Sequence, residues 1–310
     1  MSANKKISVL GGGSWGSALA CLATRAVGNC LVHTIEQEAA DEINSQHKNS
    51  RFLGDTRLPD GLKATLDIQD TIDSDIIIIA VPSFAFVKTL EDLKAVGVSD
   101  KTVFLIATKG MCENPLQLFS ERIKSMFENS FGFISGPNFA QEVAQDKFAS
   151  VTISSKDMDL AREIASTLST DKLEVSITDD IITVQIAALV KNIVAIRSGM
   201  MEAEGHGENA RAWLISMGLS EIKAIAGTIG GKPDSLSLPA VVGDLVLTSY
   251  SKTSRNTRFG FDFHNNSYSR EYLKNYPVLV EGIASARLLK KYLSTSNLEL
   301  PIISSVADRV

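Results

Sequence analysis

Short apolar runs alternate with amphipathic stretches through the first 180 or so residues of the chain. Several runs are continuously apolar, such as DIIIIAV and TVFLIA, which is typical of strands covered on both faces in a parallel sheet. We expect strands at residues 6–10, 29–33, 75–81, 102–107, 131–135, 148–154 and 172–177. The stretches between them predict helices at residues 14–26, 36–47, 84–94, 115–127 and 157–168. This alternation predicts a doubly wound, mostly parallel α/β sheet.

The pattern changes near residue 178. Residues 178–204 form one long apolar helical pattern, with Thr178, Asp179 or Asp180 as candidate caps. A second helical pattern covers residues 209–231, and no convincing strand follows it. We therefore predict a sheet domain at residues 1–178 and an all-helical domain at residues 179–310.

A glycine-rich turn follows the first predicted strand, in ISVLGGGSWGSALA. Gly11, Gly13 and Gly16 give the spacing G-x-G-x-x-G between a strand and a helix, where the motif holds the pyrophosphate of a dinucleotide. A tight turn without a ligand is the alternative. Glu36 lies twenty residues past Gly16, where an acid can accept hydrogen bonds from the adenosine ribose, and no Arg or Lys follows until Lys48. These residues favour NAD over NADP, unless Glu36 merely starts the next helix.

One lysine stands inside the most apolar helical stretch, AALVKNIVAI. A buried lysine without a partner is costly, and its pKa tends to fall. On a helix, Lys191 has small neighbours on its own face, namely Ala187, Ala188, Ala195 and Ser198. They leave room for a ligand beside a general base, or for a second helix that packs closely while the lysine reaches water. The stretch alone leaves both alternatives open.

Other charged and polar residues stand at positions suited to a ligand. Lys109 follows a predicted strand, and ligands bind at the carboxyl ends of such strands, although a solvent-facing loop lysine is the alternative. Asp244, among apolar residues in AVVGDLVLT, could hold Lys191 by a charge-assisted hydrogen bond or cap a helix. Arg255 and Asn256 supply planar donors suited to a phosphate monoester, or belong to a solvated basic loop.

Composition narrows the classes of function. The chain has 310 residues, of which 44% are hydrophobic, and its net charge is −5, so the concentrated basic face of a nucleic-acid binder is not expected. Cys21, Cys30 and Cys112 form neither a zinc-ligand spacing nor a disulfide framework, so we expect no metal site and a reducing, cytoplasmic setting. The first apolar run is too short for a signal peptide, and no run approaches the roughly eighteen apolar residues that span a membrane.

Short phrases that contain these residues extend along almost the whole chain. They are GGGSWGSALA, VPS (81–83), ATKGM (107–111), SGPNFAQEV (135–143), VKN (190–192), GENARAWLI (207–215), GDLVLT (243–248), SRNTRFG (254–260) and VEG (280–282). In this order and spacing they resemble the NAD(P)-dependent glycerol-3-phosphate dehydrogenases of the bacterial type. The resemblance implies a Rossmann-like first domain, a helical substrate domain, and NAD(H) or NADP(H) as the cofactor.

The resemblance also implies an activity and its partners. The reaction would interconvert the small molecules sn-glycerol 3-phosphate and dihydroxyacetone phosphate by hydride transfer at C2, and would supply glycerol phosphate for phospholipid synthesis. A homodimer is one assembly open to such a chain. A dehydrogenase for a phosphate-free hydroxy acid or hydroxyacyl thioester is an alternative, which SRNTR argues against. An inactive nucleotide-binding protein is another, and it would have no reason to keep Lys191, Asp244 and Arg255 together.

Individual residues receive roles from the same resemblance. Lys191 matches the general base, and we expect Lys109 and Asp244, which match ligand-binding positions, to act with it as catalytic residues. The implied substrate-binding residues are Lys109, Gly136, Asn138, Lys191, Asp244, Ser254, Arg255 and Asn256. Together with the three glycines and Glu36, the implied cofactor-binding residues are Ser14, Trp15, Lys109, Ala140, Arg255, Leu279 and Glu281. The chain departs from the family at residues 33–36, where a tryptophan and a basic residue are usual, and at Asn138, where Thr is common.

Overall fold

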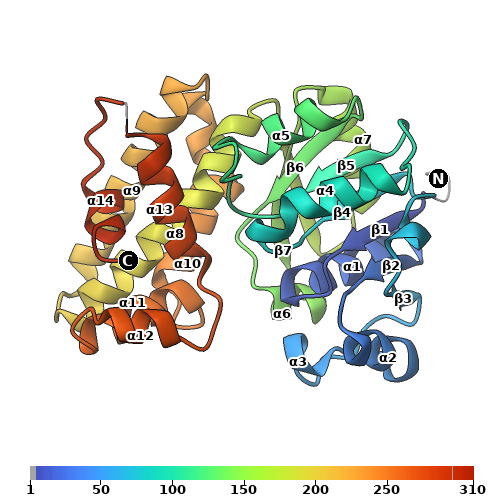
Figure 1. Ribbon diagram of the computed structural model, residues 1–310, viewed down its shortest axis with the longest axis horizontal. Helices are drawn as coiled ribbons and strands as arrows, with labels where there is room; N and C mark the ends of the chain where they lie inside the picture. Colours follow the sequence, from blue (N-terminus) through green and yellow to red (C-terminus); the bar gives the residue numbers. More distant parts are fainter. Residues whose placement is uncertain (1–4, 295) are drawn as a thin grey trace. The chain divides into compact units, whose positions relative to one another are not determined.

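The computed structural model describes residues 5–294 and 296–310, which group into two compact units (Figure 1). The first unit contains the residues up to Thr108, Phe119–Ile134 and Asn138–Asp179. The second contains Lys109–Leu118, Ser135–Pro137 and the residues from Asp180 onward. Two short segments that the sequence pattern assigned to the sheet domain therefore group with the helical unit.

An eight-stranded sheet forms the centre of the first unit, in the order β3-β2-β1-β4-β5-β6-β7-β8. Its strands are β1 (Ile7–Leu10), β2 (Cys30–His33), β3 (Leu62–Thr65), β4 (Ile76–Ile79), β5 (Val103–Ile106), β6 (Phe131–Ser135), β7 (Ala149–Ser154) and β8 (Leu173–Thr178). Successive pairs from β3 to β6 are parallel, and so is the pair β7–β8. The predicted mostly parallel sheet is confirmed. The strand order changes direction between β1 and β4, and in such sheets ligands bind beyond the carboxyl ends of the strands at this point.

Burial explains which strands the sequence pattern predicted. All residues of β1 and of β4 are buried, so both strands are written as continuous apolar runs. The strand β3 was not predicted. It lies at the edge of the sheet, and of its residues only Leu62 is buried while Lys63 is exposed, so it lacks an apolar run.

Helices connect the strands of the first unit. They are α1 (Ser14–Val27), α2 (Gln37–Gln46), α3 (Ser50–Leu53), α4 (Phe86–Ala95), α5 (Phe119–Met126), α6 (Ala140–Ala144) and α7 (Met158–Leu168). The helix predicted at residues 115–127 begins only at Phe119, because Cys112 and Gln117 pair across a short turn just before it. The prediction missed α3 and α6, which are too short to show a helical period.

From Asp180 onward the regular elements among the described residues of the second unit are all helices, and the unit is built around α8 (Ile181–Ala203), which runs through its middle (Figure 1). The other helices are α9 (Glu208–Thr228), α10 (Asp244–Tyr250), α11 (Arg255–Asn265), α12 (Arg270–Asn275), α13 (Glu281–Tyr292) and α14 (Pro301–Ala307). Of the three cap candidates it is Asp180 that caps α8, with its carboxylate accepting the N–H of Thr183 at 3.0 Å.

The composition of α8 follows from its central place. By length and hydropathy α8 could cross a membrane, which the search for uninterrupted apolar runs did not detect. However, 89% of its most apolar window is buried inside the unit. Core position therefore accounts for the apolar character of this helix.

Two glycines bring α8 and α11 into backbone contact. A Cβ on Gly199 would lie 1.9 Å from the carbonyl oxygen of Thr257, and a Cβ on Gly260 would lie 1.9 Å from that of Ile196. Any larger side chain would force the two helices apart. The close crossing fixes the start of α11 against the middle of α8, where the candidate site lies.

Candidate active site

Lys191 lies in the middle of α8 and is only 3% exposed. Its Nζ donates a hydrogen bond to Oδ1 of Asp244 at 2.5 Å, and Asp244 is 1% exposed. The lysine therefore does not reach water past a neighbouring helix, which was one of the two alternatives from the sequence. The small residues around it do pack against other helices: Ser198 donates to the carbonyl of Ser249 in α10 at 2.7 Å.

The Asp244 carboxylate gathers two ammonium groups and two hydroxyls. Its Oδ1 accepts from Lys191 and, at 3.2 Å, from the hydroxyl of Thr248. Its Oδ2 accepts from the hydroxyl of Ser135 at 3.3 Å and lies 3.9 Å from Nζ of Lys109. Two lysines thus share one buried carboxylate, which leaves an excess of one positive charge when both are protonated. This excess favours loss of a proton from one lysine.

The protonation of Lys191 responds to these neighbours. Burial lowers the pKa of Lys191 to about 7, Asp244 opposes this shift, and the positive charge of Lys109 adds to it. At neutral pH the side chain is therefore present both as an amine and as an ammonium. A group with a pKa near the working pH is suited to take a proton and to return it.

Local structure explains how Asp244 reaches the lysine. A π-helical turn at Pro239–Gly243 ends just before Asp244, which is the first residue of α10. Such wide turns re-aim the residues that follow and are frequent at functional sites. At the other end of α10, the buried Arg211 donates to the carbonyls of Ser249 and Tyr250 at 3.2 and 3.0 Å. Of the two roles considered for Asp244, the structure shows the hydrogen bond to Lys191.

Amide groups from three helices meet beside Lys191. The side-chain amide of Asn256 donates to the carbonyl oxygen of the Asn192 side chain at 2.9 Å, and the Gly282 N–H donates to Oδ1 of Asn256 at 3.1 Å. A Cβ on Gly282 would lie 2.8 Å from both Asn256 Oδ1 and the backbone oxygen of Asn192, so this position requires glycine. No role was predicted for Asn192 or Gly282 from the sequence, although they directly follow Lys191 and Glu281 in the motifs VKN and VEG. The network joins α8, α11 and α13.

The other predicted residues of the second unit lie around the ends of α11 and α13. Ser254 is buried and caps α11, accepting the N–H three residues on at 3.3 Å, so that Arg255 begins the helix with an exposed side chain. Glu281 begins α13, and burial raises its pKa overall. The positive charges of Lys109, Lys191 and Arg255 oppose this shift. Glu281 therefore lies in the field of the same cations as Asp244.

Gly136 and Leu279, two predicted site residues of this unit, have no polar side chain. Gly136 is buried next to Ser135, and Leu279 is 53% exposed just before α13.

The glycine turn lies in the first unit and has the backbone that the motif requires. Gly11 has φ +115°, and a Cβ on Gly16 would lie 1.9 Å from the oxygen of Gly11, so neither position accepts a side chain. Gly13 is the N-cap of α1, and a Cβ there would meet nothing within 4 Å. The space over the start of this helix is thus open for the phosphates of a dinucleotide, and these residues fit that group.

The residues that flank the turn are placed as follows. Ser14 donates from its hydroxyl to the carbonyl of Phe52 at 3.1 Å, and Trp15 is partly buried against the apolar core. Glu36 is the N-cap of α2 but makes no capping hydrogen bond; its carboxylate instead lies 2.8 Å from Arg51. Glu36 thus stands at the start of α2, and its side chain pairs with Arg51.

Asn138 and Ala140 adjoin the start of α6. The side-chain amide of Asn138 donates to the carbonyl of Ser150 at 2.8 Å. Its Oδ1 is buried, and no hydrogen-bond donor reaches it from the described residues. Ala140 is the first residue of α6. Asn138 thus has a fixed orientation, and its Oδ1 is a buried acceptor without a donor among the described residues.

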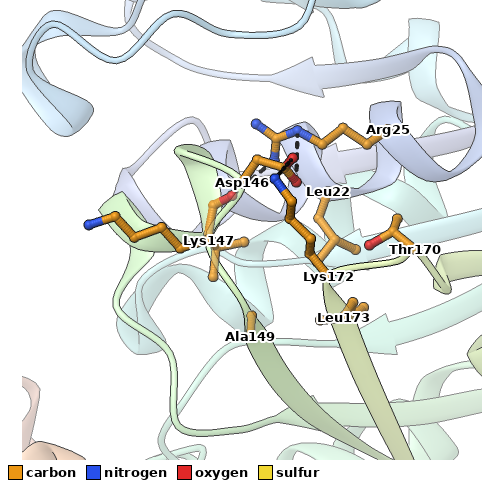
Figure 2. Close-up of a pocket in the computed structure, with 9 residues that line it drawn as sticks. Leu22, Arg25, Asp146, Lys147, Ala149, Thr170, Lys172 and Leu173 are labelled. Atoms are coloured by element: carbon orange, nitrogen blue, oxygen red, sulfur yellow. Dashed lines mark hydrogen bonds and ion pairs between the residues drawn. The ribbon is translucent and has the colours of Figure 1, made fainter.

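A pocket elsewhere in the first unit has a structural explanation (Figure 2). Arg25 donates to the carbonyls of Val143 and Ala144, the last residues of α6, and both Arg25 and Lys172 pair with Asp146. Two cations thus share one carboxylate, and these contacts tie the end of α6 to α1 and to the start of β8. None of the site residues predicted from the sequence lines this pocket.

Comparison with known proteins decides the family. The N-terminal model of the NAD-dependent glycerol-3-phosphate dehydrogenases matches residues 6–161, and the C-terminal model of the same family matches residues 180–309. The chain belongs to this family. The predicted membership, and with it the class of oxidoreductases, is confirmed.

Individual relatives extend over nearly the whole chain. Glycerol-3-phosphate dehydrogenase [NAD(P)+] of Rickettsia bellii is 41% identical over 98% of this chain and 98% of its own length. The Rickettsia typhi protein of the same name is also 41% identical, over 100% of this chain and 98% of its own. The crystal structure of glycerol-3-phosphate dehydrogenase from Coxiella burnetii has a TM-score of 0.91 at 31% identity, covering 98% of this chain and 93% of that one. The predicted fold class, a Rossmann-like sheet domain followed by a helical one, is thereby confirmed.

Proposed function

We propose that this chain interconverts sn-glycerol 3-phosphate and dihydroxyacetone phosphate, with NAD(H) or NADP(H) as the redox cofactor. The observation that carries the proposal is the buried cluster in which Lys191 and Lys109 share the carboxylate of Asp244. The relatives that match the chain from end to end are named for this dehydrogenase activity.

Lys191 exchanges the proton of the reaction. During oxidation its neutral amine takes the proton of the C2 hydroxyl, and during reduction its ammonium returns a proton to the carbonyl oxygen. When bound, the nicotinamide accepts or supplies the hydride at C2. A pKa of about 7 for Lys191 supports both directions, because both protonation states are populated near neutral pH.

Asp244 and Lys109 set the orientation and the pKa of Lys191. Asp244 orients Nζ of Lys191 through their hydrogen bond and keeps part of the population protonated in spite of burial. Lys109, 3.9 Å from the other oxygen of Asp244, supplies a positive charge that lowers the pKa of Lys191. We assign Lys109 a second role, in which it donates to the reacting oxygen of the substrate and polarises the carbonyl.

The start of α11 is proposed to hold the phosphate. Arg255 and Asn256 open this helix, and Ser254 caps it by accepting a hydrogen bond from a backbone N–H of the first turn, which fixes their backbone conformation. A guanidinium offers a phosphate dianion two parallel donors. Gly136 and Asn138 complete the proposed substrate set, and Asn138 brings an acceptor oxygen for a hydroxyl group.

The dinucleotide is proposed to bind at the glycine turn of the first unit. Gly11, Gly13 and Gly16 shape the turn, with Ser14 and Trp15 beginning α1. We assign the adenosine ribose to Glu36, which favours NAD(H). Further proposed cofactor contacts are Lys109, Ala140, Arg255, Leu279 and Glu281. In the cell we propose a cytoplasmic enzyme that supplies glycerol phosphate for phospholipid synthesis.

The activity is tested by oxidation of NADH, followed at its absorbance band, on addition of dihydroxyacetone phosphate. Lys191→Ala should lower kcat by about a hundredfold or more, because general acid–base catalysis is lost. Lys223→Ala, which removes an exposed lysine of α9, is the matched control and should leave the rate unchanged. Absence of turnover in the wild-type chain, or full activity of Lys191→Ala, would contradict the proposal.

A further inference from the structure

An ion pair joins the start of α2 to α3 beside the glycine turn. Nη1 of Arg51 lies 2.8 Å from Oε2 of Glu36, fifteen residues earlier in the chain. The side chains are 70% and 31% exposed, and such pairs contribute little to stability. Arg51 has no role in the sequence-based prediction, in which Lys48 is the first basic residue after Glu36; Lys48 pairs instead with Asp55. The position of Arg51 therefore matters more than its contribution to folding.

The segment that carries Arg51 is fastened to the glycine turn on both sides of it. Asn49 is fully buried, and its side-chain amide donates to the carbonyl of Gly12 at 2.9 Å. Phe52 accepts the hydroxyl of Ser14 at 3.1 Å, and the guanidinium lies 5.3 Å from the centroid of the Phe52 ring. Arg51 is thus held at the turn through its neighbours, unlike an arginine on a free surface loop.

The charge of the pair changes what Glu36 can select. A lone carboxylate at the end of β2 accepts hydrogen bonds from the ribose hydroxyls of NAD and repels the 2′-phosphate of NADP. With Arg51 in contact, the pair carries no net charge, and the guanidinium keeps a planar set of donors suited to a phosphate. We propose that Arg51 is a cofactor-specificity residue that admits NADP(H) to this site in spite of Glu36. The inference rests on dinucleotide binding at the glycine turn, as proposed above.

In this proposal Glu36 contacts the ribose of NAD(H), and Arg51 contacts the 2′-phosphate of NADP(H). With NAD(H), Glu36 receives the ribose hydroxyls and Arg51 remains paired with it. With NADP(H), Arg51 exchanges its contact with Glu36 for the 2′-phosphate. Because the pair is exposed and weak, this exchange costs little free energy. The same site then serves either cofactor without a change in the backbone.

Direct binding of the cofactors to the full-length protein, without substrate, tests this division. NADH and NADPH are titrated separately into wild type and Arg51→Gln, and the nicotinamide fluorescence is followed. The dissociation constant for NADPH should rise about tenfold to a hundredfold in Arg51→Gln, because charge-assisted hydrogen bonds are lost. The dissociation constant for NADH should change less than about threefold, because for this cofactor the variant loses only a weak surface ion pair. Glu36→Gln should do the opposite, weakening NADH and tightening NADPH.

Arg57→Gln is the matched control, because Arg57 is also 70% exposed and pairs with an acid, Asp60, at 2.7 Å. It should leave both dissociation constants unchanged. If wild type binds neither cofactor, the dinucleotide site itself is wrong. If it binds them and Arg51→Gln weakens both equally, or weakens NADH more, the specificity role is overturned. Thermal unfolding of each variant shows whether the fold is retained.

Discussion

Replacement of Asp244 by asparagine removes one charge from the buried cluster around Lys191 and keeps the shape of the side chain. Asp244 raises the pKa of Lys191, while burial and Lys109 lower it, and the balance is about 7. Loss of an opposite charge in contact moves a pKa by about 1–3 units. The pKa of Lys191 should therefore fall to about 4–6 in Asp244→Asn, a shift that corresponds to about 1.4–4 kcal/mol.

The pH dependence of the rate reports this shift in both directions of the reaction. Oxidation of glycerol 3-phosphate needs the neutral amine, so kcat/KM of wild type should rise with pH through about 7. Reduction of dihydroxyacetone phosphate needs the ammonium, so its rate should fall through the same value. In Asp244→Asn both midpoints should move to lower pH, and reduction should be nearly lost at neutral pH. Initial rates at saturating cofactor between about pH 4 and pH 9 measure the midpoints.

Thermal unfolding gives a second readout that does not need an active variant. The pKa of Lys191 is about 7 in the folded chain, whereas that of an unfolded lysine is about 10.4. Between these values the unfolded chain binds more protons, so the contribution of Lys191 to stability rises with pH across this window. In Asp244→Asn the pKa of Lys191 in the folded chain is lower, so the pH range over which its contribution to stability rises begins at a lower pH. The variant should therefore lose stability relative to wild type as the pH falls below about 7, by about 1.4 kcal/mol per pH unit.

Ser135→Ala is the control variant that changes the contacts of Asp244 but keeps its charge. The Ser135 hydroxyl donates to the same carboxylate at 3.3 Å, so its removal perturbs Asp244 but keeps its charge. The midpoints should move less in this variant than in Asp244→Asn. Identical midpoints in wild type and Asp244→Asn, or midpoints at higher pH, would refute the claim that the Asp244 charge sets the protonation of Lys191.

Two further predictions concern the packing that supports the site. Gly199→Ala places a Cβ 1.9 Å from the oxygen of Thr257, so it should cost roughly 1–3 kcal/mol in chemical denaturation and raise KM for the phosphate substrate as α11 moves. Gly227→Ala, whose Cβ would meet nothing within 4 Å, should be neutral or stabilising, and equal losses in the two variants would argue against the packing explanation. Glu221 is buried and accepts two backbone N–H groups at the start of α14, at 2.7 and 3.1 Å, so Glu221→Gln should lower stability by about 1–3 kcal/mol. A melting temperature unchanged from wild type would show that these hydrogen bonds do not anchor α14.

Local sequence patterns predicted those parts of the fold that are buried on all sides. The strands β1 and β4 and the helix α8 are enclosed by other elements, so their apolar composition is visible in a short window of sequence. The glycine turn was predictable for a different reason, because its backbone requires glycine at Gly11 and Gly16. The edge strand β3 and the short helix α3 have neither property, and the sequence pattern did not reveal them.

Local sequence patterns could not predict contacts between residues that are far apart in the chain. Asn192 and Asn256 are 64 residues apart, and Asn256 and Gly282 are 26 apart, so their hydrogen bonds depend on how α8, α11 and α13 pack. Arg51 meets Glu36 only because Asn49 fastens α3 to the glycine turn. Family resemblance pointed to several of these residues, but it did not indicate which atoms meet.

The lysine in α8 shows how the two kinds of information combine. Its apolar helix predicts the direction of the pKa shift, because burial disfavours a charged side chain wherever its partners lie. The size of the shift depends on Asp244, 53 residues away, and on Lys109, whose charges act in opposite directions. The carboxylate of Asp244 favours the ammonium form of Lys191, and the positive charge of Lys109 offsets part of this effect. Burial is therefore the feature that makes a base out of this core lysine, and the shared carboxylate limits how far its pKa falls.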